Sequence, residues 1–235
     1  MSLKYEFTGE TKKVFGRTLH RIRALKNIEK YGVTAGDIGG WIEKDTNLSQ
    51  DGEAWVYGEA CVYGEACVCG EACVYGDARV YGEAWVYGEA WVYGEACVCG
   101  EAWVYGNARV YGEACVYGGE WVYGNARVYG DARVYGNACV CGDAWVYGDA
   151  RVYGKACVYG GEWASSPLYI QGTRYSFYIA STEEIGIDIE IHDATYWKEN
   201  WDNLMNSLGL KDKQEEYAMY FNLAAKRYGF EELNL

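Results

Sequence analysis

A glycine recurs at every sixth position from Gly52 to Gly160, and the residues between follow one apolar and polar pattern. The unit is Gly-acid-Ala-x-Val-Tyr, as in GDARVY from Gly76 to Tyr81. Alternate residues of an extended strand share a face, so Ala and Val point one way and the x residue and Tyr point the other. The Gly-acid pair falls at a corner, where glycine gives the backbone freedom to bend. The 18 hexads predict short strands wound around a narrow apolar axis.

The spacing of the two inward residues carries a family resemblance. A valine is followed four places later by an alanine, as in Val56 and Ala60 or Val62 and Ala66. In this the chain resembles the hexapeptide-repeat, left-handed parallel β-helix proteins. The resemblance implies a mainly β fold with three hexads per coil, about six to eight coils, and a left-handed winding. It implies no single function, since that family includes acyltransferases, anhydrases, structural proteins and ice binders.

The chain divides into three parts. Residues 1–39 precede the repeat, and LKYEFTG and RTLHRIRAL predict a β-hairpin that turns around Thr11–Gly16. We expect this segment to be an N-terminal cap, because an open coil would expose core and strand edges. We assign residues 40–163 to the β-helix. Residues 40–51 keep the six-residue phase, with Leu48 in an alanine slot, and Glu120 stands in another alanine slot, which predicts a bulge or a looser coil.

Residues 164–235 predict a small C-terminal α+β module. Pro167 marks its boundary, LYIQG and RYSFYIA predict a hairpin, and EIGIDIEI predicts one further strand. Apolar residues at helical spacing predict one helix from Asp193 to Gly209 and a second that ends at Gly229, with a capping box at Asp212. We expect aromatic residues of the two helices to form an oligomer or partner surface: Trp197, Trp201, Tyr217, Tyr220 and Phe221.

The charge limits the function classes. The chain has 34 acids, 21 bases and a net charge of −13, which argues against direct binding of nucleic acid. Residues 1–51 carry nine bases against seven acids, so the acidity belongs to the coils and the tail. No run of apolar residues in this sequence is of the kind that predicts a membrane helix or a signal peptide. The GDIGGW stretch at residues 36–41, the GNARVYG-type hexads and the tail together resemble a family of tailed phages, prophages and gut bacteria, usually called polymer-forming or hypothetical. That resemblance implies that the protein is located in the cytoplasm of a bacterial host cell.

The corner acids form columns when residues 18 apart are stacked. One column is acidic at all six levels, and like charges at this spacing repel. It could attract a basic partner, mimic a nucleic-acid backbone, chelate calcium weakly or only keep the protein soluble. We call this set the acidic column: Glu59, Asp77, Glu95, Glu113, Asp131 and Asp149.

Aromatic residues form columns as well. Trp85, Trp103 and Trp121 stack on one outer face, and tyrosines follow nearly every coil. Stacked aromatic residues stabilise parallel ladders, but so many outward rings exceed what a monomer usually leaves in water. Burial against a partner or a second copy is the interpretation we favour, ahead of sugar binding. An ice-binding face would want a flat threonine array, and the 18 hexads contain no threonine.

We predict no catalytic residue, no metal and no cofactor. His20 and His192, the two histidines, both lie outside the coils, whereas hexapeptide-repeat acyltransferases resemble one another in using a histidine base at a cleft between subunits. The ten cysteines take outward positions and include three Cys-x-Cys pairs: Cys67/Cys69, Cys97/Cys99 and Cys139/Cys141. A four-ligand zinc site would need two such pairs side by side, and disulfides are disfavoured in a reducing cytosol. We therefore interpret the cysteines as compact residues of an outer face, and the sequence leaves open free, metal-bound and cross-linked states.

These patterns favour a non-enzymatic interaction protein, a dimer or trimer that binds a host protein or itself and is a candidate inhibitor of a host defence protein. The alternatives are a degenerate acyl or nucleotidyl transferase, and a structural assembly protein.

Overall fold

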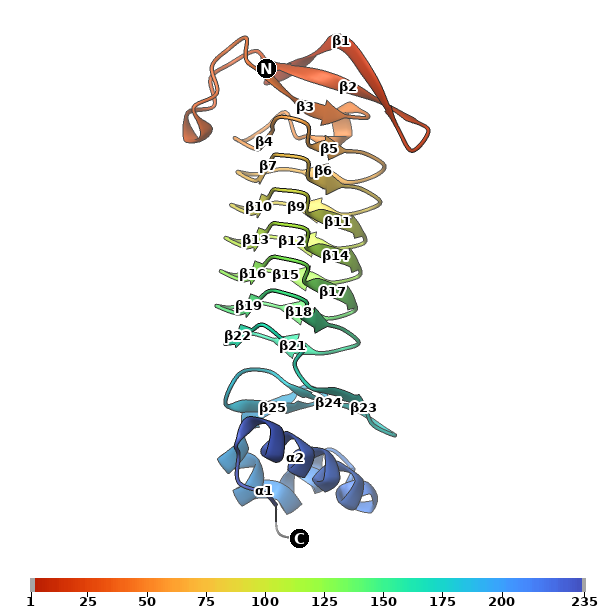
Figure 1. Ribbon diagram of the computed structural model, residues 1–235, viewed down its shortest axis with the longest axis vertical. Helices are drawn as coiled ribbons and strands as arrows, with labels where there is room; N and C mark the ends of the chain where they lie inside the picture. Colours follow the sequence, from red (N-terminus) through yellow and green to blue (C-terminus); the bar gives the residue numbers. More distant parts are fainter. Residues whose placement is uncertain (1–2, 234–235) are drawn as a thin grey trace.

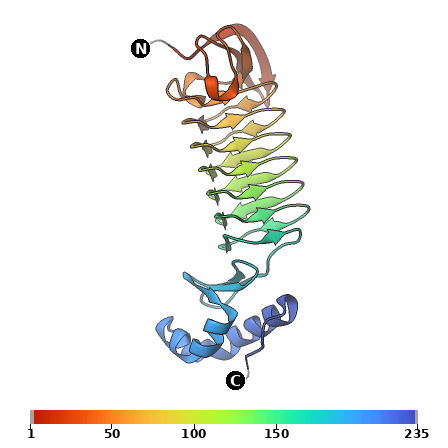
Figure 2. The same ribbon diagram turned by 90° about the vertical axis from the view of Figure 1, so that its left-hand side faces the viewer.

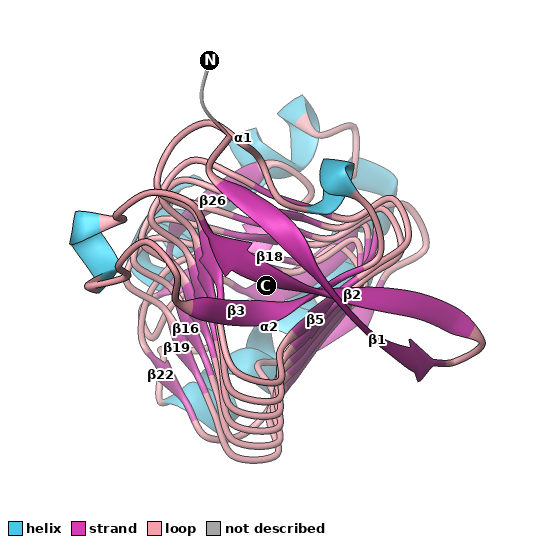
Figure 3. Ribbon diagram, turned by 90° about the horizontal axis from the view of Figure 1, so that it is seen from above, coloured by secondary structure: helices cyan, strands magenta, loops and turns pink. Residues whose placement is uncertain are grey.

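The computed structural model describes residues 3–233. It is an elongated, mainly β molecule in which stacked coils separate an N-terminal hairpin from a C-terminal α+β segment (Figure 1). Viewed from the side, the coils form a regular stack (Figure 2), and viewed from the end they have three sides (Figure 3). Residues 1–2 of the expected cap and 234–235 of the expected module lie outside the described residues.

Each side of the solenoid is a parallel sheet with one short strand per coil, and we name each sheet by its first strand in the coils. The β4 sheet holds β4 (Trp55–Val56), β7 (Cys73–Val74), β10 (Trp91–Val92), β13 (Arg109–Val110), β16 (Arg127–Val128), β19 (Trp145–Val146) and β22 (Glu162–Trp163). The β5 sheet holds β5 (Cys61–Val62), β8 (Arg79–Val80), β11 (Cys97–Gly100), β14 (Cys115–Gly118), β17 (Arg133–Gly136) and β20 (Arg151–Val152). The β6 sheet holds β6 (Cys67–Val68), β9 (Trp85–Val86), β12 (Trp103–Val104), β15 (Trp121–Val122), β18 (Cys139–Val140) and β21 (Cys157–Val158).

Residues 18 apart pair between neighbouring coils, as Trp103 does with Trp121 and Val104 with Val122. The β4 sheet has seven strands, so the solenoid has about seven turns. The inward valines and alanines of the hexads are 0–1 % exposed and form one continuous core. The prediction of a β-solenoid of about this length with two C-terminal helices is therefore confirmed.

The corner glycines stack as closely as the strands do. Gly100 has a φ of +70°, and a Cβ built on it would lie 2.8 Å from the backbone nitrogen of Gly118 in the next coil. Any side chain here would meet backbone as well as an unfavourable φ. The six-residue spacing of glycine is thus required by the approach of successive coils.

The N-terminal cap comprises the hairpin of β1 (Tyr5–Val14) and β2 (Arg17–Ala24) and η1 (Glu29–Tyr31). The expected boundary at residue 39 falls within β3 (Ile38–Ile42), and we count β3 and the following η2 (Asp45–Asn47) with the cap. The predicted hairpin is confirmed, and Figure 3 shows it crossing the end of the coils. Trp41 N donates to Ala60 O at 2.9 Å and Ser49 N to Val68 O at 2.9 Å. The buried Lys4 donates from Nζ to Ala54 O at 2.8 Å. The cap therefore supplies donors to inward carbonyls that have no coil above them.

The predicted phase of residues 40–51 is wrong by two residues. Ile42 pairs with Val62 and Leu48 bridges to Val68, so both occupy the valine column. Leu48 is fully buried but not in the alanine slot. No glycine marks a corner between Leu48 and Gly52, and the coil accommodates its two additional residues there.

The C-terminal segment has the antiparallel sheet β23 (Tyr169–Gln171), β24 (Ser176–Ile179), β25 (Glu184–Ile187) and β26 (Glu190–Asp193), then α1 (Ala194–Ser207), η3 (Lys211–Lys213) and α2 (Gln214–Tyr228). It supplies acceptors to the last coil: Tyr159 N donates to Ala180 O at 3.0 Å. None of the described helices is long and apolar enough to cross a membrane.

Two local predictions for this segment are wrong. EIGIDIEI forms two strands, because the chain turns at Asp188, whose φ is +57°. The capping box at Asp212 is absent: α2 begins after Lys213, which makes no side-chain cap. Helix α1 does begin after Asp193, whose carboxylate accepts from Tyr196 N at 2.7 Å, and Gly229 ends α2 in the left-handed conformation.

Glu120 does not produce the expected bulge. Trp103 still pairs with Trp121, so the register passes through this coil unchanged. The side chain instead enters the core, where it is 0 % exposed and neither carboxylate oxygen has a hydrogen-bond partner. Desolvation by burial raises the pKa of Glu120 to about 7. The coil keeps its strand pairing and holds an unsatisfied acid in an alanine slot.

We predict that Glu120→Ala, which restores the residue usual at this slot, removes a pH dependence of stability. An acid whose pKa is raised from 4.5 to about 7 on folding favours the folded state below pH 4.5 and loses that contribution as the pH rises to about 7. From pH 4 to pH 8 the free energy of unfolding of the wild type should fall by ~3 kcal/mol relative to the variant. Urea unfolding at several pH values measures this.

Glu120→Gln is the matched control, since it keeps the volume and polarity of the side chain but cannot ionise. It should lack the same pH-dependent term. Parallel stability profiles for the wild type and both variants would show that Glu120 does not titrate in this range.

Candidate interaction surfaces

The acidic column lies at the corner between the β4 and β5 sheets, but the cap occupies its first member. Glu59 accepts hydrogen bonds from Lys12 Nζ at 3.0 Å, Arg21 Nη1 at 2.8 Å and Trp41 Nε1 at 3.0 Å. The Lys12 bond, followed by those of Arg21 and Trp41, lowers the pKa of Glu59 to about 2. Glu59 therefore anchors the cap, and its charge is paired within the chain although its side chain stays 56 % exposed.

The remaining five carboxylates are exposed. Within residues 3–233 none of them forms an ion pair, although arginines occupy the adjoining β5 sheet. We call this set the free acidic column: Asp77, Glu95, Glu113, Asp131 and Asp149.

At the other two corners, lysines pair with some of the acids inside the chain. Lys30 of the cap pairs with Glu71 and, at 2.9 Å, with Glu89, while Lys44 pairs with Glu65 at 2.6 Å. Further along the first of these corners, amides replace acids. Asn107 donates to Asn125 at 3.2 Å and Asn125 donates to Asp143 at 3.0 Å. Lysines from the cap and this amide ladder reduce the repulsion that stacking would otherwise cause.

A tyrosine ladder runs beside the free acidic column. Tyr75, Tyr93, Tyr111, Tyr129 and Tyr147 each lie two residues before one of its carboxylates. Successive rings stack with centroids 4.7–5.1 Å apart and interplanar angles of 1–7°. The ladder fixes the step from one carboxylate level to the next at about 5 Å.

The predicted tryptophans lie on the β6 sheet. Trp85, Trp103 and Trp121 are 42 %, 39 % and 52 % exposed, and their rings stack at 6.0 and 6.2 Å. A second ladder of Tyr87, Tyr105 and Tyr123 runs beside them, and Tyr87 meets Trp103 edge to face at 6.1 Å. Six rings thus form one outward aromatic patch.

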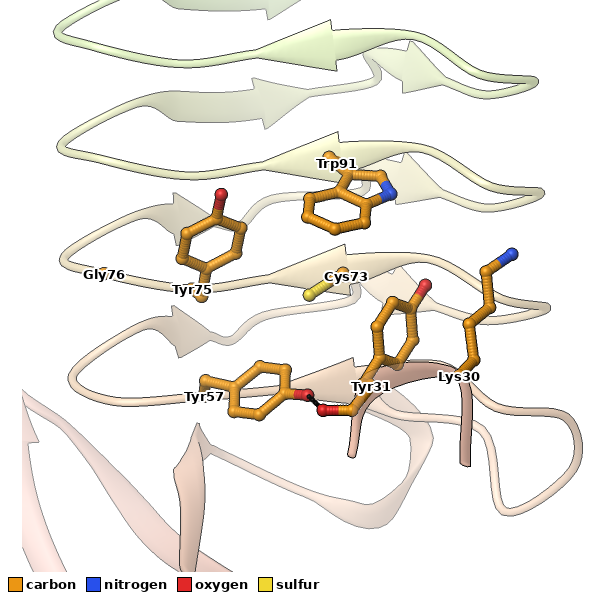
Figure 4. Close-up of a pocket in the computed structure, with 7 residues that line it drawn as sticks. All are labelled: Lys30, Tyr31, Tyr57, Cys73, Tyr75, Gly76 and Trp91. Carbon is orange, nitrogen blue, oxygen red and sulfur yellow. Dashed lines mark hydrogen bonds between the residues drawn. The ribbon is translucent and has the colours of Figure 1, made fainter. Parts of the chain in front are cut away.

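An aromatic pocket that the sequence did not indicate lies where the cap meets the β4 sheet. The ring centroid of Tyr31 of η1 lies 6.4 Å from that of Tyr57 and 5.9 Å from that of Trp91, and Tyr75 lines the opposite side of the cavity (Figure 4). Tyr57 Oη donates to Tyr31 O at 3.0 Å. The cavity has a volume of about 480 Å³, and the buried Cys73 lies in its wall. Sequence periodicity cannot find this pocket, because Tyr31 belongs to the non-repeating cap.

None of the ten cysteines, all of which lie in the described residues, forms a disulfide in this structure. The structure brings three of them together on the β6 sheet: the Sγ atoms of Cys139, Cys141 and Cys157 all lie within 4.8 Å of one another. Hydrogen bonds to Cys139, Cys157 and Tyr123 lower the pKa of the Cys141 thiol, and the contact with Cys141 raises the pKa of Cys139. The stacking of Cys139 over Cys157 follows from the 18-residue register, whereas the approach of Cys141 does not.

The aromatic residues predicted as a partner surface of the C-terminal module form its core. Trp197, Tyr217 and Phe221 are 0 % exposed and Trp201 is 3 % exposed. Tyr220 is half-buried and donates to Glu216 at 2.8 Å. Helical spacing correctly grouped these residues, but the apolar stripe packs on the module itself. It therefore offers no surface to a partner.

The two histidines lie at opposite ends of the molecule. His20 is in β2, where its ring lies 4.9 Å from that of Phe7, and His192 is in β26, bonded to Glu190 at 3.0 Å. Neither histidine lines the aromatic pocket or the cysteine cluster.

Comparison with known families matches only the coils. A family model described as the YdcK beta solenoid repeat matches residues 72–88, 102–118, 122–136, 132–148 and 144–160. The chain is similar to that family over these segments, which make up less than half of its length. No curated protein matches the chain.

We predict that Lys12→Met raises the pKa of Glu59 toward its ordinary value of 4.5, because the Lys12 bond is the largest cause of its low pKa. A depressed carboxylate pKa stabilises the fold above pH 4.5, and this contribution disappears as the pH falls toward 2. The variant should therefore lose less stability than the wild type over this acid range. Carbon NMR of labelled glutamate gives the pKa directly.

Lys13→Met is the control, since the exposed Lys13 forms no ion pair with any residue in the described range 3–233. An unchanged Glu59 titration in Lys12→Met would contradict the assigned cause.

Proposed function

We propose that this chain is a non-enzymatic interaction protein that binds a basic protein partner along the free acidic column. The observation that carries the proposal is a row of five exposed carboxylates with no ion pair to any residue from 3 to 233. The backbone ladder and the adjoining tyrosine stack hold the row rigid, so binding requires little ordering of this surface. The aromatic patch lies on the β6 sheet, the side that does not meet at this corner, so it would be a separate contact surface.

The spacing of the column favours a particular kind of partner. Its step of about 5 Å is shorter than the Debye length of about 8 Å in physiological salt, so the fields of neighbouring carboxylates add. An α-helix rises about 5.4 Å per turn, and lysine or arginine at successive turns would meet successive carboxylates. A DNA strand carries one charge per 3.4 Å, a denser row than this column. We therefore favour a basic α-helix as the partner, including a helix that ordinarily binds nucleic acid. We favour it over a partner whose binding depends on the exact spacing of DNA phosphates.

We propose in addition that the coils wind left-handed, as in the hexapeptide-repeat proteins that the sequence resembles. The valine-to-alanine spacing of four residues supports this. The GDIGGW stretch supports a phage, prophage or gut-bacterial origin and action in the bacterial cytoplasm, where the partner would be a host protein or a second copy in a dimer or trimer. An experimental density map at side-chain resolution tests the handedness.

Two other functions remain as alternatives. A degenerate acyl or nucleotidyl transferase requires a trimer with His20 or His192 at a cleft between subunits, and calorimetry with an acyl-coenzyme A tests it. A structural assembly protein requires end-to-end stacking, which electron microscopy of the purified protein tests.

We predict that neutralising the free acidic column abolishes partner capture. The test variant combines Asp77→Asn, Glu95→Gln, Glu113→Gln, Asp131→Asn and Asp149→Asn. The control variant makes the same change of charge elsewhere with Glu83→Gln, Glu101→Gln, Glu199→Gln, Asp202→Asn and Glu215→Gln. Pull-down from bacterial lysate with quantitative mass spectrometry should recover one stoichiometric partner with the wild type and the control, and at least about tenfold less with the test variant.

Rising salt should release that partner, because the contacts are exposed ion pairs. Equal recovery by the two variants would contradict the column as the binding surface. Failure of the wild type to recover any partner, together with a monomer in light scattering, would contradict the interaction function itself.

A further inference from the structure

Three thiols converge at one place on the surface of the solenoid. Cys139 points outward from β18, and Cys157 lies directly beside it one coil further on, since the two residues pair in register. Cys141 lies just beyond the end of β18, and its Sγ is found on the same side as those of the other two cysteines. All three Sγ atoms lie within 4.8 Å of one another, and Cys141 is only 7 % exposed.

We propose that Cys139, Cys141 and Cys157 form a binding site for one thiophilic metal ion, Cu(I) or Zn(II). Thiolate sulfur selects these soft or borderline ions over magnesium, calcium and manganese, which prefer oxygen. Metal–sulfur bonds of about 2.3 Å place ligand sulfurs about 3.8 Å apart, so each pair needs to close by at most about 1 Å. Cu(I) would be three-coordinate, and Zn(II) would take a fourth ligand from solvent. Each thiol releases its proton to solvent as its sulfur binds, and no electron is transferred.

The site lies where cysteines take the place of aromatic residues in two neighbouring columns. The tryptophan column of the β6 sheet continues from Trp121 to Cys139, and the tyrosine ladder beside it continues from Tyr123 to Cys141. Cys157 packs against the core that joins the last coils to the C-terminal sheet, and the next residue but one, Tyr159, donates its N–H to Ala180 O. The three sulfurs therefore sit on the rigid ladder near the docked module, which limits the motion needed to close around an ion.

The chain contains a close sequence match to this cluster that does not converge in the same way. Cys97-Val-Cys99 is followed 18 residues later by Cys115-Val-Tyr, the same arrangement as Cys139-Val-Cys141 and Cys157-Val-Tyr. There β11 continues to Gly100 and pairs Cys99 with Tyr117, whereas β18 ends at Val140. Among the described residues, the group formed by Cys139, Cys141 and Cys157 is the one whose three sulfurs meet the 4.8 Å limit. The Cys97 group is thus a matched control within the same molecule.

The test titrates the reduced full-length protein with Cu(I) and separately with Zn(II), each in competition with a coloured chelator. Three proteins are compared: the wild type, the site variant Cys139→Ser/Cys141→Ser/Cys157→Ser and the control variant Cys97→Ser/Cys99→Ser/Cys115→Ser. We expect one tight equivalent of at least one of the two ions in the wild type and the control. The site variant should lose affinity by more than the 10–100-fold typical of removing an outer-shell partner.

Mapping of thiol alkylation by mass spectrometry provides a second readout that does not depend on how well the site variant folds. In the wild type, the bound ion should protect Cys139, Cys141 and Cys157 and leave Cys97, Cys99 and Cys115 reactive. The proposal is overturned if neither ion binds, or if the site and control variants bind equally. Circular dichroism and thermal melting establish that each variant retains the fold.

Discussion

Hydrogen bonding between successive coils is the constraint on which the other features of this molecule depend. Outward-facing residues donate their N–H groups to carbonyls of inward alanines and valines one coil further on, as Trp55 does to Ala72. The first coil therefore has inward carbonyls without a coil to supply donors, and the last coil has outward N–H groups without acceptors. The ends are closed by different chemistry: Lys4, Asn47 and backbone N–H groups on one side, and Ala180 and Ser166 oxygens on the other.

The same register decides which side chains meet. Stacking like on like stabilises tyrosine and tryptophan ladders but brings carboxylates to about 5 Å, where they repel. At two corners the chain relieves this repulsion with lysines of the cap and with the Asn107–Asn125–Asp143 amide ladder. At the corner of the acidic column, no residue after Glu59 pairs with a lysine or belongs to an amide ladder within the described residues. The corner of the acidic column is also the one that keeps an acid at all six levels, which makes the free acidic column the distinctive surface of the rod.

The six-residue period predicted the features that the backbone geometry determines. It did not predict the features that depend on the direction or packing of individual side chains. Glycine spacing and the valine–alanine pair identified the core, the corners and the coil number. The phase before Gly52 was wrong because no glycine marks the corner after Leu48. The sequence predicts a distorted backbone at Glu120. Instead, the strand pairing between coils is kept, and the Glu120 carboxylate is left without a hydrogen-bond partner. The helical stripes of the C-terminal module were found, although periodicity cannot tell whether such a stripe packs internally, as that of Trp197 does, or on a partner. Likewise, the pairing of Cys139 with Cys157 was predictable, while the approach of Cys141 depends on side-chain direction.

The corner glycines, stacked backbone against backbone, make each full turn of the solenoid interchangeable with the next. Each cap contacts mainly the coils at its own end, so duplication or deletion of an 18-residue segment would leave both caps in place and change only the distance between them, by about 4.8 Å per turn. Gain or loss of a single hexad would instead rotate every later column onto the neighbouring side and scatter the aromatic, acidic and sulfur ladders. The length of the solenoid can therefore change by whole turns during evolution, while the columns of side chains on each side stay the same.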